Sequence, residues 1–271
     1  MLEQTDHYQL EVHARQMAAD SLGNIWFRGP LDEIFKHNLA QRTTEMVAFP
    51  NDAASFVFTS TKAVYGTWGG EIWSMDYCTR KAVMLLATPT NSPVVNLAVD
   101  LVSGMIFCST KSEILGVRID GAISVRLPIE FVEDILATGD RLWFVKRGRI
   151  SLWNLKKNHL SMTSETGSYL LVQHAMNGMI AGLRGELDIL SDDGRIIESV
   201  PGTINRIAWD ERNCILGYAN GDESINFCRT PSSVQSLDTY SVSNASAILS
   251  VQDFGFVVSW NGELLVFRNL V

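Results

Sequence analysis

The sequence shows none of the patterns that mark secreted or membrane-spanning proteins. Its first residues, MLEQTDHYQLEVHARQ, contain no basic segment followed by an apolar one, so no secretory signal is visible. No run of about 18 apolar residues is present. The most apolar candidate, SPVVNLAVDLVSGMIFCS, is interrupted by Asn96 and Asp100. We therefore expect a protein of the cytoplasm or nucleus that does not insert into a membrane.

Cysteine is scarce, and its spacing suits neither cross-linking nor metal binding. The chain has four cysteines, none in a CxxC pair and all inside apolar or strand-like stretches: Cys78, Cys108, Cys214 and Cys228. This predicts reduced, mostly buried thiols, as in intracellular proteins. No Cys/His cluster has the spacing of a zinc site, so we expect no bound metal and no cofactor.

Clustered basic charge and catalytic motifs are also missing. The 271 residues include 22 Lys and Arg against 30 Asp and Glu, a net charge of −8. Binding along a phosphate backbone needs clustered Lys and Arg, so we expect no direct nucleic-acid binding. There is no Gly-x-Ser-x-Gly elbow, and the segments GLRGEL and TWGGEI lack phosphate-loop spacing. We therefore expect no catalytic residues and no small-molecule substrate.

What the chain does contain is an internal repeat. The segments MAADSLGNIWF, LAVDLVSGMIF and IAWDERNCILG begin at Met17, Leu97 and Ile207, and they align without gaps. Each has an apolar residue, an alanine, one further residue, an aspartate, three turn residues and a second apolar run. The aspartates are 80 and 110 residues apart. These separations are two and three units of roughly 37 to 40 residues, a period typical of propeller blades.

The same order of short strands recurs in the intervening segments, and helical periodicity of useful length is absent. The pattern predicts one all-β domain of seven units, with boundaries near residues 13–49, 50–88, 89–128, 129–165, 166–201, 202–239 and 240–271. Alternation in EIWSMDY and RISLWNL indicates third strands with one packed side and one wetter side.

The turn between the second and third strand of each unit gives the clearest repeat signal. Asn220–Gly221 and Asn261–Gly262 carry the residues that tolerate positive φ at both centres of a type I′ turn. Arg147–Gly148 and Arg184–Gly185 occupy the same place with a less favourable first residue. We expect tight β-hairpins at these positions.

The two ends of the chain complement each other. The last unit stops after its third strand, at LLVFRNLV, whereas a spare strand-like segment, HYQLEVH, precedes the first unit. An N-terminal strand in residues 1–12 that completes the last unit would remove an exposed edge. The sequence therefore predicts a seven-bladed β-propeller of four-stranded antiparallel blades, closed by the N-terminal strand. Six blades is the alternative, since one boundary of diverged units is easily miscounted.

In unit size, strand order and closure by a terminal strand, the chain resembles the WD40-type propellers over its whole length. The signature dipeptides differ. LWNL, with Asn154 in the acidic place, is the nearest match to the third-strand Trp-Asp pair, and no Gly-His pair precedes any unit. The resemblance implies a propeller fold and a role in protein binding.

A second resemblance points to an enzyme. DSLGNIWF, starting at Asp20, is similar to a turn of the virginiamycin B lyase propellers and, more loosely, of the lactonase propellers. In those families the turn recurs in blade after blade, whereas here it is well formed once. A lyase also needs a catalytic histidine near a metal-binding glutamate, and no such constellation is identifiable among the five histidines. A lyase-like or lactonase-like enzyme holding Mg²⁺ or Ca²⁺ remains the alternative.

The remaining functional signal lies at the tips of the second hairpins, which the WD40 resemblance places on one face. The candidate partner-binding residues are Arg28, Trp68, Lys111, Lys146, Arg147, Arg149, Arg184 and Trp260. Basic tips in an acidic protein, together with tryptophan, have the composition of an interaction hot spot. The alternatives are tip charges that serve solubility alone and tryptophans that pack on the next blade.

These observations predict a non-catalytic scaffold or adaptor subunit that binds other proteins. We expect the partner to present an acidic, partly extended segment across the hairpin tips. Arg147, Arg149 and Arg184 would pair with its carboxylates, and a tryptophan would contact an apolar side chain.

Overall fold

The computed structural model describes most of the chain. The described residues are 2–10, 14, 16–29, 31, 33–49, 52–59, 61–77, 79–89, 91–100, 102–164, 167–174, 180–191, 193–210, 212–221, 223–230, 233–242 and 245–269. All regular structure in them is β-strand, so the described part has no helix that could cross a lipid bilayer. Three of the cysteines form no disulfide, namely Cys108, Cys214 and Cys228, and Cys78 lies outside the described residues.

Most of the strands are short, and they follow one another with few intervening residues. They are β1 Leu2–Gln9, β2 Gln16–Ala19, β3 Asn24–Arg28, β4 Ile34–Asn38, β5 Thr43–Val47, β6 Ala53–Phe58, β7 Lys62–Thr67, β8 Glu71–Asp76, β9 Ala82–Ala87, β10 Asn96–Asp100, β11 Met105–Ser109, β12 Ile114–Val117, β13 Ile123–Leu127, β14 Val132–Thr138, β15 Arg141–Lys146, β16 Arg149–Asn154, β17 His159–Thr163, β18 Leu171–His174, β19 Ile180–Leu183, β20 Gly185–Leu190, β21 Ile196–Asp210, β22 Ile215–Asn220, β23 Ser224–Thr230, β24 Ser233–Ser241, β25 Ala245–Val251, β26 Gly255–Trp260 and β27 Glu263–Asn269.

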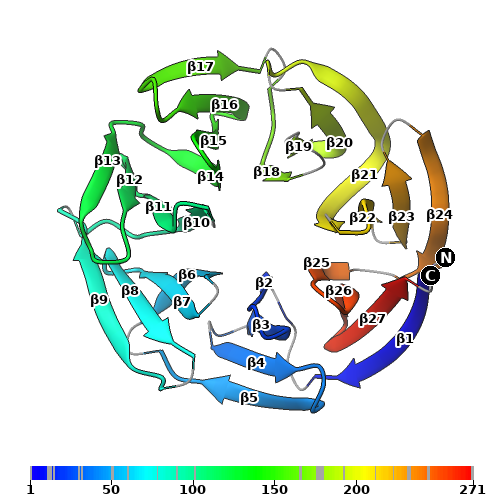
Figure 1. Cartoon of the computed structure of the whole chain (residues 1–271). Helices are drawn as coiled ribbons and strands as arrows, with labels where there is room; N and C mark the ends of the chain where they lie inside the picture. The colour runs from blue at the N-terminus through cyan, green and yellow to red at the C-terminus, as the bar shows by residue number, and fades with distance from the viewer. Residues whose placement is uncertain are drawn as a thin grey trace. The chain divides into compact units, whose positions relative to one another are not determined.

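These strands form sheets in which chain neighbours are hydrogen-bonded (Figure 1). Five sheets have four strands each, with the orders β2-β3-β4-β5, β6-β7-β8-β9, β10-β11-β12-β13, β14-β15-β16-β17 and β1-β27-β26-β25. A sixth sheet runs from β18 to β24 in sequence order. Its long strand β21 pairs with β20 through Ile196–Ile204 and with β22 through Ile204–Asp210. Counting β21 twice, the described residues form seven groups of four strands.

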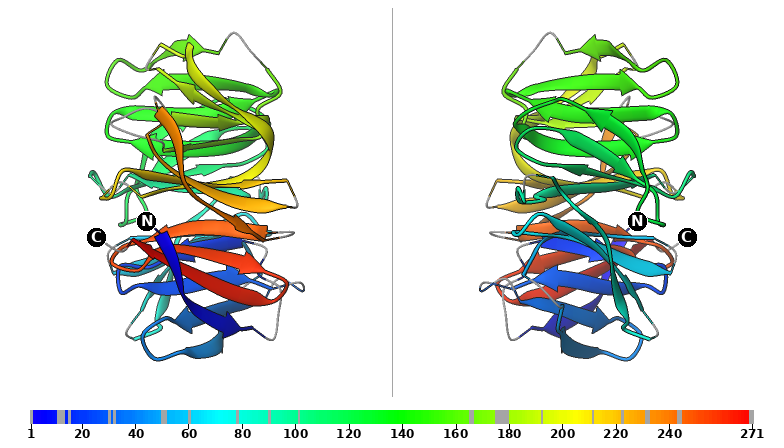
Figure 2. Two further views of the ribbon diagram at one scale, coloured as in Figure 1. Left: turned by 90° about the vertical axis from the view of Figure 1, so that its right-hand side faces the viewer. Right: turned by 90° about the vertical axis from the view of Figure 1, so that its left-hand side faces the viewer.

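The N-terminal strand belongs to the last of these groups. β1 pairs antiparallel with β27, from Leu2 opposite Asn269 to Gln9 opposite Glu263, and Figure 2 shows the two strands side by side. The N-terminal segment therefore pairs with the last strand of the chain, as the sequence predicts. The strand covers residues 2–9, and residues 11–13 of the expected segment lie outside the described part.

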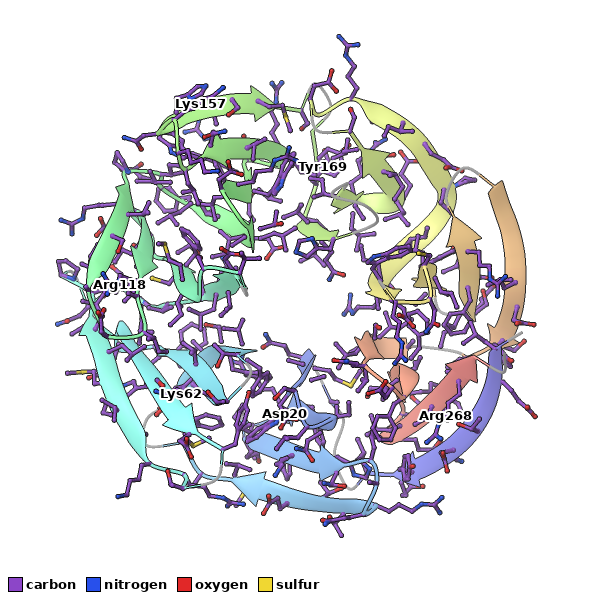
Figure 3. All side chains as sticks on the ribbon, viewed as in Figure 1. Asp20, Lys62, Arg118, Lys157, Tyr169 and Arg268 are labelled. Carbon is purple, nitrogen blue, oxygen red and sulfur yellow. The ribbon has the colours of Figure 1, made fainter. Side chains whose placement is uncertain are left out.

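The repeated aspartates play the same part in three hairpin turns. Asp20, Asp100 and Asp210 are buried at the first hairpin turn of their groups. The carboxylate of Asp20 accepts the backbone N–H of Leu22 (2.9 Å), that of Asp100 accepts the N–H of Ser103 (3.1 Å), and that of Asp210 accepts the N–H of Asn213 (3.1 Å). Figure 3 shows Asp20 at the β2–β3 turn. Because one buried carboxylate pairs several turn donors, the aspartate fixes the turn.

The second hairpin turns follow the sequence prediction in part. Both centres have positive φ at Asn261–Gly262 (46° and 80°) and at Arg147–Gly148 (52° and 68°). At Asn220–Gly221 only the glycine does, because Asn220 is still paired, opposite Ser224. A longer loop replaces the expected two-residue turn there.

The chain divides into two compact units, each with its own apolar core. The first unit comprises Met1–Ala48 with Gln173–Val271, and the second comprises Phe49–Val172. In the first, Phe227 of β23 packs against Phe256 of β26 with ring centroids 5.0 Å apart. In the second, residues of β11 to β13 share one cluster with Leu142 and Phe144 of β15. Burial of these apolar faces between neighbouring sheets supplies most of the favourable free energy of folding.

Removal of the N-terminal strand tests the β1–β27 pairing. Deleting residues 1–12 leaves the backbone of β27 unpaired along one edge and removes the buried side chains of Leu2 and Tyr8. We expect the truncated chain to aggregate or to melt far below the full chain, because an open strand edge recruits other chains. Replacing the exposed Glu3 and Gln9 by alanine keeps the pairing and should leave the melting temperature nearly unchanged. A truncated chain that melts like the full one would show that β1 contributes nothing.

The half-buried carboxylate of Asp134 in the second unit predicts a pH dependence of stability. Burial raises the pKa of Asp134 to about 6, although the carboxylate accepts the backbone N–H of Val172 at 2.9 Å. A carboxyl with a higher pKa in the folded state binds its proton more tightly there, so its contribution to stability falls as pH rises from about 4 to about 6. The shift corresponds to at most about 3 kcal/mol.

Asp134→Asn retains an acceptor for Val172 and removes the titration. Equilibrium unfolding by denaturant between pH 4 and pH 7 should therefore show a flatter profile for this variant than for the wild type. The control is Asp120→Asn, which changes an exposed carboxylate paired with Arg118 in the same unit. Parallel profiles for Asp134→Asn and the wild type would contradict the assignment.

Candidate functional site

The turn between β15 and β16 is held in a strained backbone conformation by its neighbours. Arg147 has a φ of 52°, unusual for a residue with a side chain, and Gly148 has a φ of 68°. The carboxylate of Glu133 accepts the Gly148 N–H at 3.3 Å, and the Gly148 carbonyl accepts the N–H of Tyr169 at 2.8 Å. A Cβ on residue 148 would lie 2.7 Å from the backbone nitrogen of Ser168, so only glycine fits under this connection.

Three basic side chains surround this turn, and none of them has an ion-pair partner within the described residues. Lys146 ends β15, Arg147 lies in the turn and Arg149 begins β16, with Lys146 directly opposite Arg149. Lys146 is half-buried, and the two arginines are exposed. Like charges directly opposite each other on a sheet are unfavourable. The hairpin therefore concentrates three positive charges, which the Glu133 carboxylate at the Gly148 N–H offsets in part.

A pocket of about 440 Å³ lies beside these charges, and we call it the basic pocket. Its lining residues are Ile129, Phe144, Lys146, Arg147, Arg149, Ser151, Trp153, Leu160 and Thr163. Successive side chains of a strand point to opposite faces, so Arg149, Ser151 and Trp153 of β16 line one face of the sheet. Its size falls within the range of about 300 to 1,000 Å³ that is usual for ligand sites.

The floor of the basic pocket continues the apolar core of the second unit. Phe144 is only 3% exposed, and Ile129, from the connection after β13, belongs to the same cluster. Trp153 packs against this cluster, and its buried indole nitrogen has no acceptor in the described part of the chain. Leu160, opposite Trp153 on the neighbouring strand, is 49% exposed. The pocket thus combines a fixed floor with an apolar wall that remains in contact with solvent.

Two further tip residues of the second unit are exposed to solvent. Trp68, in the β7–β8 turn, is 47% exposed. Lys111, in the β11–β12 turn, is exposed, and its carbonyl accepts the N–H of Phe131 at 3.1 Å. Phe131 is 66% exposed and has a φ of 52°, which is a strained conformation for an aromatic residue. Trp68 and Lys111 thus lie in the same kind of hairpin turn as Arg147, and Phe131 lies in the same connection as Ile129, between β13 and β14.

The other three predicted residues lie in the first unit and make contacts within it. The guanidinium of Arg184 bonds the carboxylate of Asp188 at 2.8 Å and pairs with Glu186. Asp188 is fully buried, so this arginine compensates an internal charge. Trp260 is half-buried against the core of its unit, and its indole nitrogen is buried. Arg28 ends β3 and is half-buried.

Sequence reasoning located the basic hairpin and missed the apolar half of the pocket. Trp153 and Leu160 are separated by the β16–β17 turn, and nothing local distinguishes them from core residues. The alternation in RISLW was the available signal, since it places Trp153 on the same strand face as Arg149. The described residues contain no group of three or more His, Cys, Asp or Glu side chains that could hold a metal ion.

Comparison with known proteins finds similar structures at low sequence identity. No protein-family model matches the chain, and a search of curated proteins finds no match. One similar structure is a crystal structure of the RRP9 WD40 repeats, with 9% identity and a TM-score of 0.82, covering 99% of this chain and all of the other.

Another similar structure is a chain in the crystal structure of the Mitotic Checkpoint Complex. It has 10% identity and a TM-score of 0.80, and the match covers 99% of this chain and 92% of that one. Likeness at this level of identity concerns the fold, and the four-stranded antiparallel sheets agree with it. The predicted fold class is confirmed: the chain is an all-β protein with the fold of a WD40-type propeller.

Proposed function

We propose that this protein is a non-catalytic interaction scaffold, an adaptor subunit that binds an acidic, partly extended segment of another protein at the basic pocket. One observation carries the proposal. Lys146, Arg147 and Arg149 gather at one turn, with no ion pair to any residue in the described part of the chain, beside an open pocket with an apolar floor. Binding of proteins is consistent with the fold, since one structure similar to this chain belongs to a multiprotein complex.

The electrostatics favour an acidic partner despite the net charge of −8. At physiological salt, charges separated by more than about 8 Å are largely screened, so the local cluster dominates what a docking segment experiences. A carboxylate between Arg147 and Arg149 would accept charge-assisted hydrogen bonds and would relieve the repulsion between Lys146 and Arg149. The same cluster would raise the rate of encounter with acidic segments.

The composition of the basic pocket favours binding over catalysis. Its lining joins three basic side chains, two hydroxyl groups and four apolar side chains. We therefore assign it the capture of a peptide segment, with Lys111 and Trp68 as flanking contacts in the same unit. Arg184 and Trp260 are left out of the surface, because their side chains already pair or pack internally.

Reversal of the two arginine charges tests this function. Peptides selected from a random display library on the full chain should be rich in Asp and Glu. Their Kd should rise with salt, and the double variant Arg147→Glu, Arg149→Glu should raise it at least about tenfold, since each charge-assisted bond contributes about 1.5 to 3 kcal/mol. The fold should be intact, because exposed charges contribute little to stability.

The matched control reverses two exposed lysines of the same unit, Lys81→Glu and Lys157→Glu, and changes the net charge equally. Figure 3 shows Lys157 beside β17, at the turn that follows β16. The control should leave the Kd within about twofold of the wild type, as screening predicts. Equal losses in the two double variants would show that overall charge, not this pocket, governs binding.

A further inference from the structure

The side chains of the basic pocket are arranged in three zones along the strands. Lys146 and Arg149 are opposite each other at the turn end. Ser151 follows, opposite Phe144 on one side and Thr163 on the other, and the two hydroxyl oxygens are 3.1 Å apart. Trp153 comes last, opposite Leu160. The zones run from basic through hydroxyl-bearing to apolar.

The apolar zone is incomplete by itself. Leu160 is 49% exposed, and within the described sheet β17 is the edge strand, so no further strand covers this wall. Trp153 contributes its indole ring to the lining of the pocket. Aromatic and aliphatic pairs across strands gain stability when a third apolar group covers them. A large apolar side chain of a bound segment would bury both residues.

We propose that the basic pocket recognises a two-part motif in a peptide segment. The motif is an acidic residue and, a few residues away, one aromatic or branched aliphatic residue. The side chain of the second residue fills the end of the pocket between Trp153 and Leu160. This inference rests on the proposed function and specifies its ligand. The occupant is an extended peptide segment of another protein. Its backbone crosses the hydroxyl zone of Ser151 and Thr163, where it finds hydrogen-bond partners.

The spacing of the motif follows from strand geometry. Arg149 and Trp153 are four residues apart on β16, which corresponds to about 13 Å between their Cα atoms. An arginine side chain covers part of that distance, and an extended ligand advances about 3.3 to 3.6 Å per residue. The acidic residue and the apolar anchor should therefore be about two to four positions apart. Neighbouring acidic residues on the far side of the turn would add contacts with Arg147.

A free fatty acid also combines an anionic group with an apolar chain, and the middle of the pocket distinguishes it from a peptide. The middle of the pocket presents two hydroxyl groups, which favour a ligand with donors and acceptors in its middle section. A peptide backbone provides these, whereas an alkyl chain would leave the hydroxyl zone in contact with hydrocarbon. The hydroxyl zone therefore favours the peptide.

The test uses the full-length chain and synthetic peptides taken from the display selection. We expect a consensus of Asp or Glu two to four positions from Phe, Tyr, Trp, Leu or Ile. Replacing that apolar residue by alanine should raise the Kd at least about tenfold, as for an anchor residue in an interface. Leu160→Ser should raise it about five- to tenfold, and Thr163→Trp, which fills the middle of the pocket, should abolish binding.

A double-mutant cycle locates the anchor. On the Leu160→Ser protein, replacing the peptide's apolar residue by alanine should cost much less than on the wild type, because both changes remove the same contact. The control is Leu22→Ser, at an exposed leucine in the β2–β3 turn, which should leave every Kd unchanged.

Three results would overturn this inference, and they differ in what else they affect. If Leu160→Ser and Thr163→Trp bind like the wild type while the double arginine reversal does not, the anchor site is wrong and the proposed function survives. If neither set of variants changes the Kd of the peptides, the proposed function fails too. If dodecanoate binds as tightly as the peptide and displaces it, the pocket is a site for an amphiphile.

Discussion

The left-handed turn at Arg147–Gly148 is the constraint on which the candidate site depends. Glycine is required because a connecting segment passes where a Cβ would lie, 2.7 Å from the Ser168 nitrogen. An arginine with positive φ costs about 1 to 2 kcal/mol. Hydrogen bonds from Gly148 to Glu133 and from Tyr169 to Gly148 offset this strain. The turn brings Lys146 opposite Arg149 and directs Arg147 to solvent.

The same hairpin connects the charges to the apolar core. Phe144, two residues before Lys146, lies in the cluster between the β10–β13 and β14–β17 sheets, and Ile129 closes that cluster from the preceding connection. Because the floor is packed against the neighbouring sheet, the basic groups and the Trp153–Leu160 wall keep their relative positions without a ligand. A preorganised surface of this kind spends less free energy on ordering when it binds. An exposed tip thereby becomes a defined pocket.

The sequence was informative wherever the determinant is local. The buried aspartates and the Asn261–Gly262 turn follow from residue chemistry within a few positions, so the strand order and fold class were predictable. The basic hairpin was predictable for the same reason. Burial was not predictable: Glu186 and Asp188 are close to Arg184 in sequence, but only the fold shows that Asp188 is fully buried and holds the guanidinium, and that Trp260 packs into a core. Leu160 was missed because its exposure depends on what covers the sheet.

One pocket should hold both an acidic group and an apolar side chain of the same extended segment. A crystal structure of the chain with a selected peptide tests this most directly. We predict a carboxylate oxygen about 3 Å from the guanidinium of Arg147 or Arg149, and the anchor side chain in contact with Trp153 and Leu160. A peptide bound elsewhere, with the Trp153–Leu160 wall still open to solvent, would contradict it.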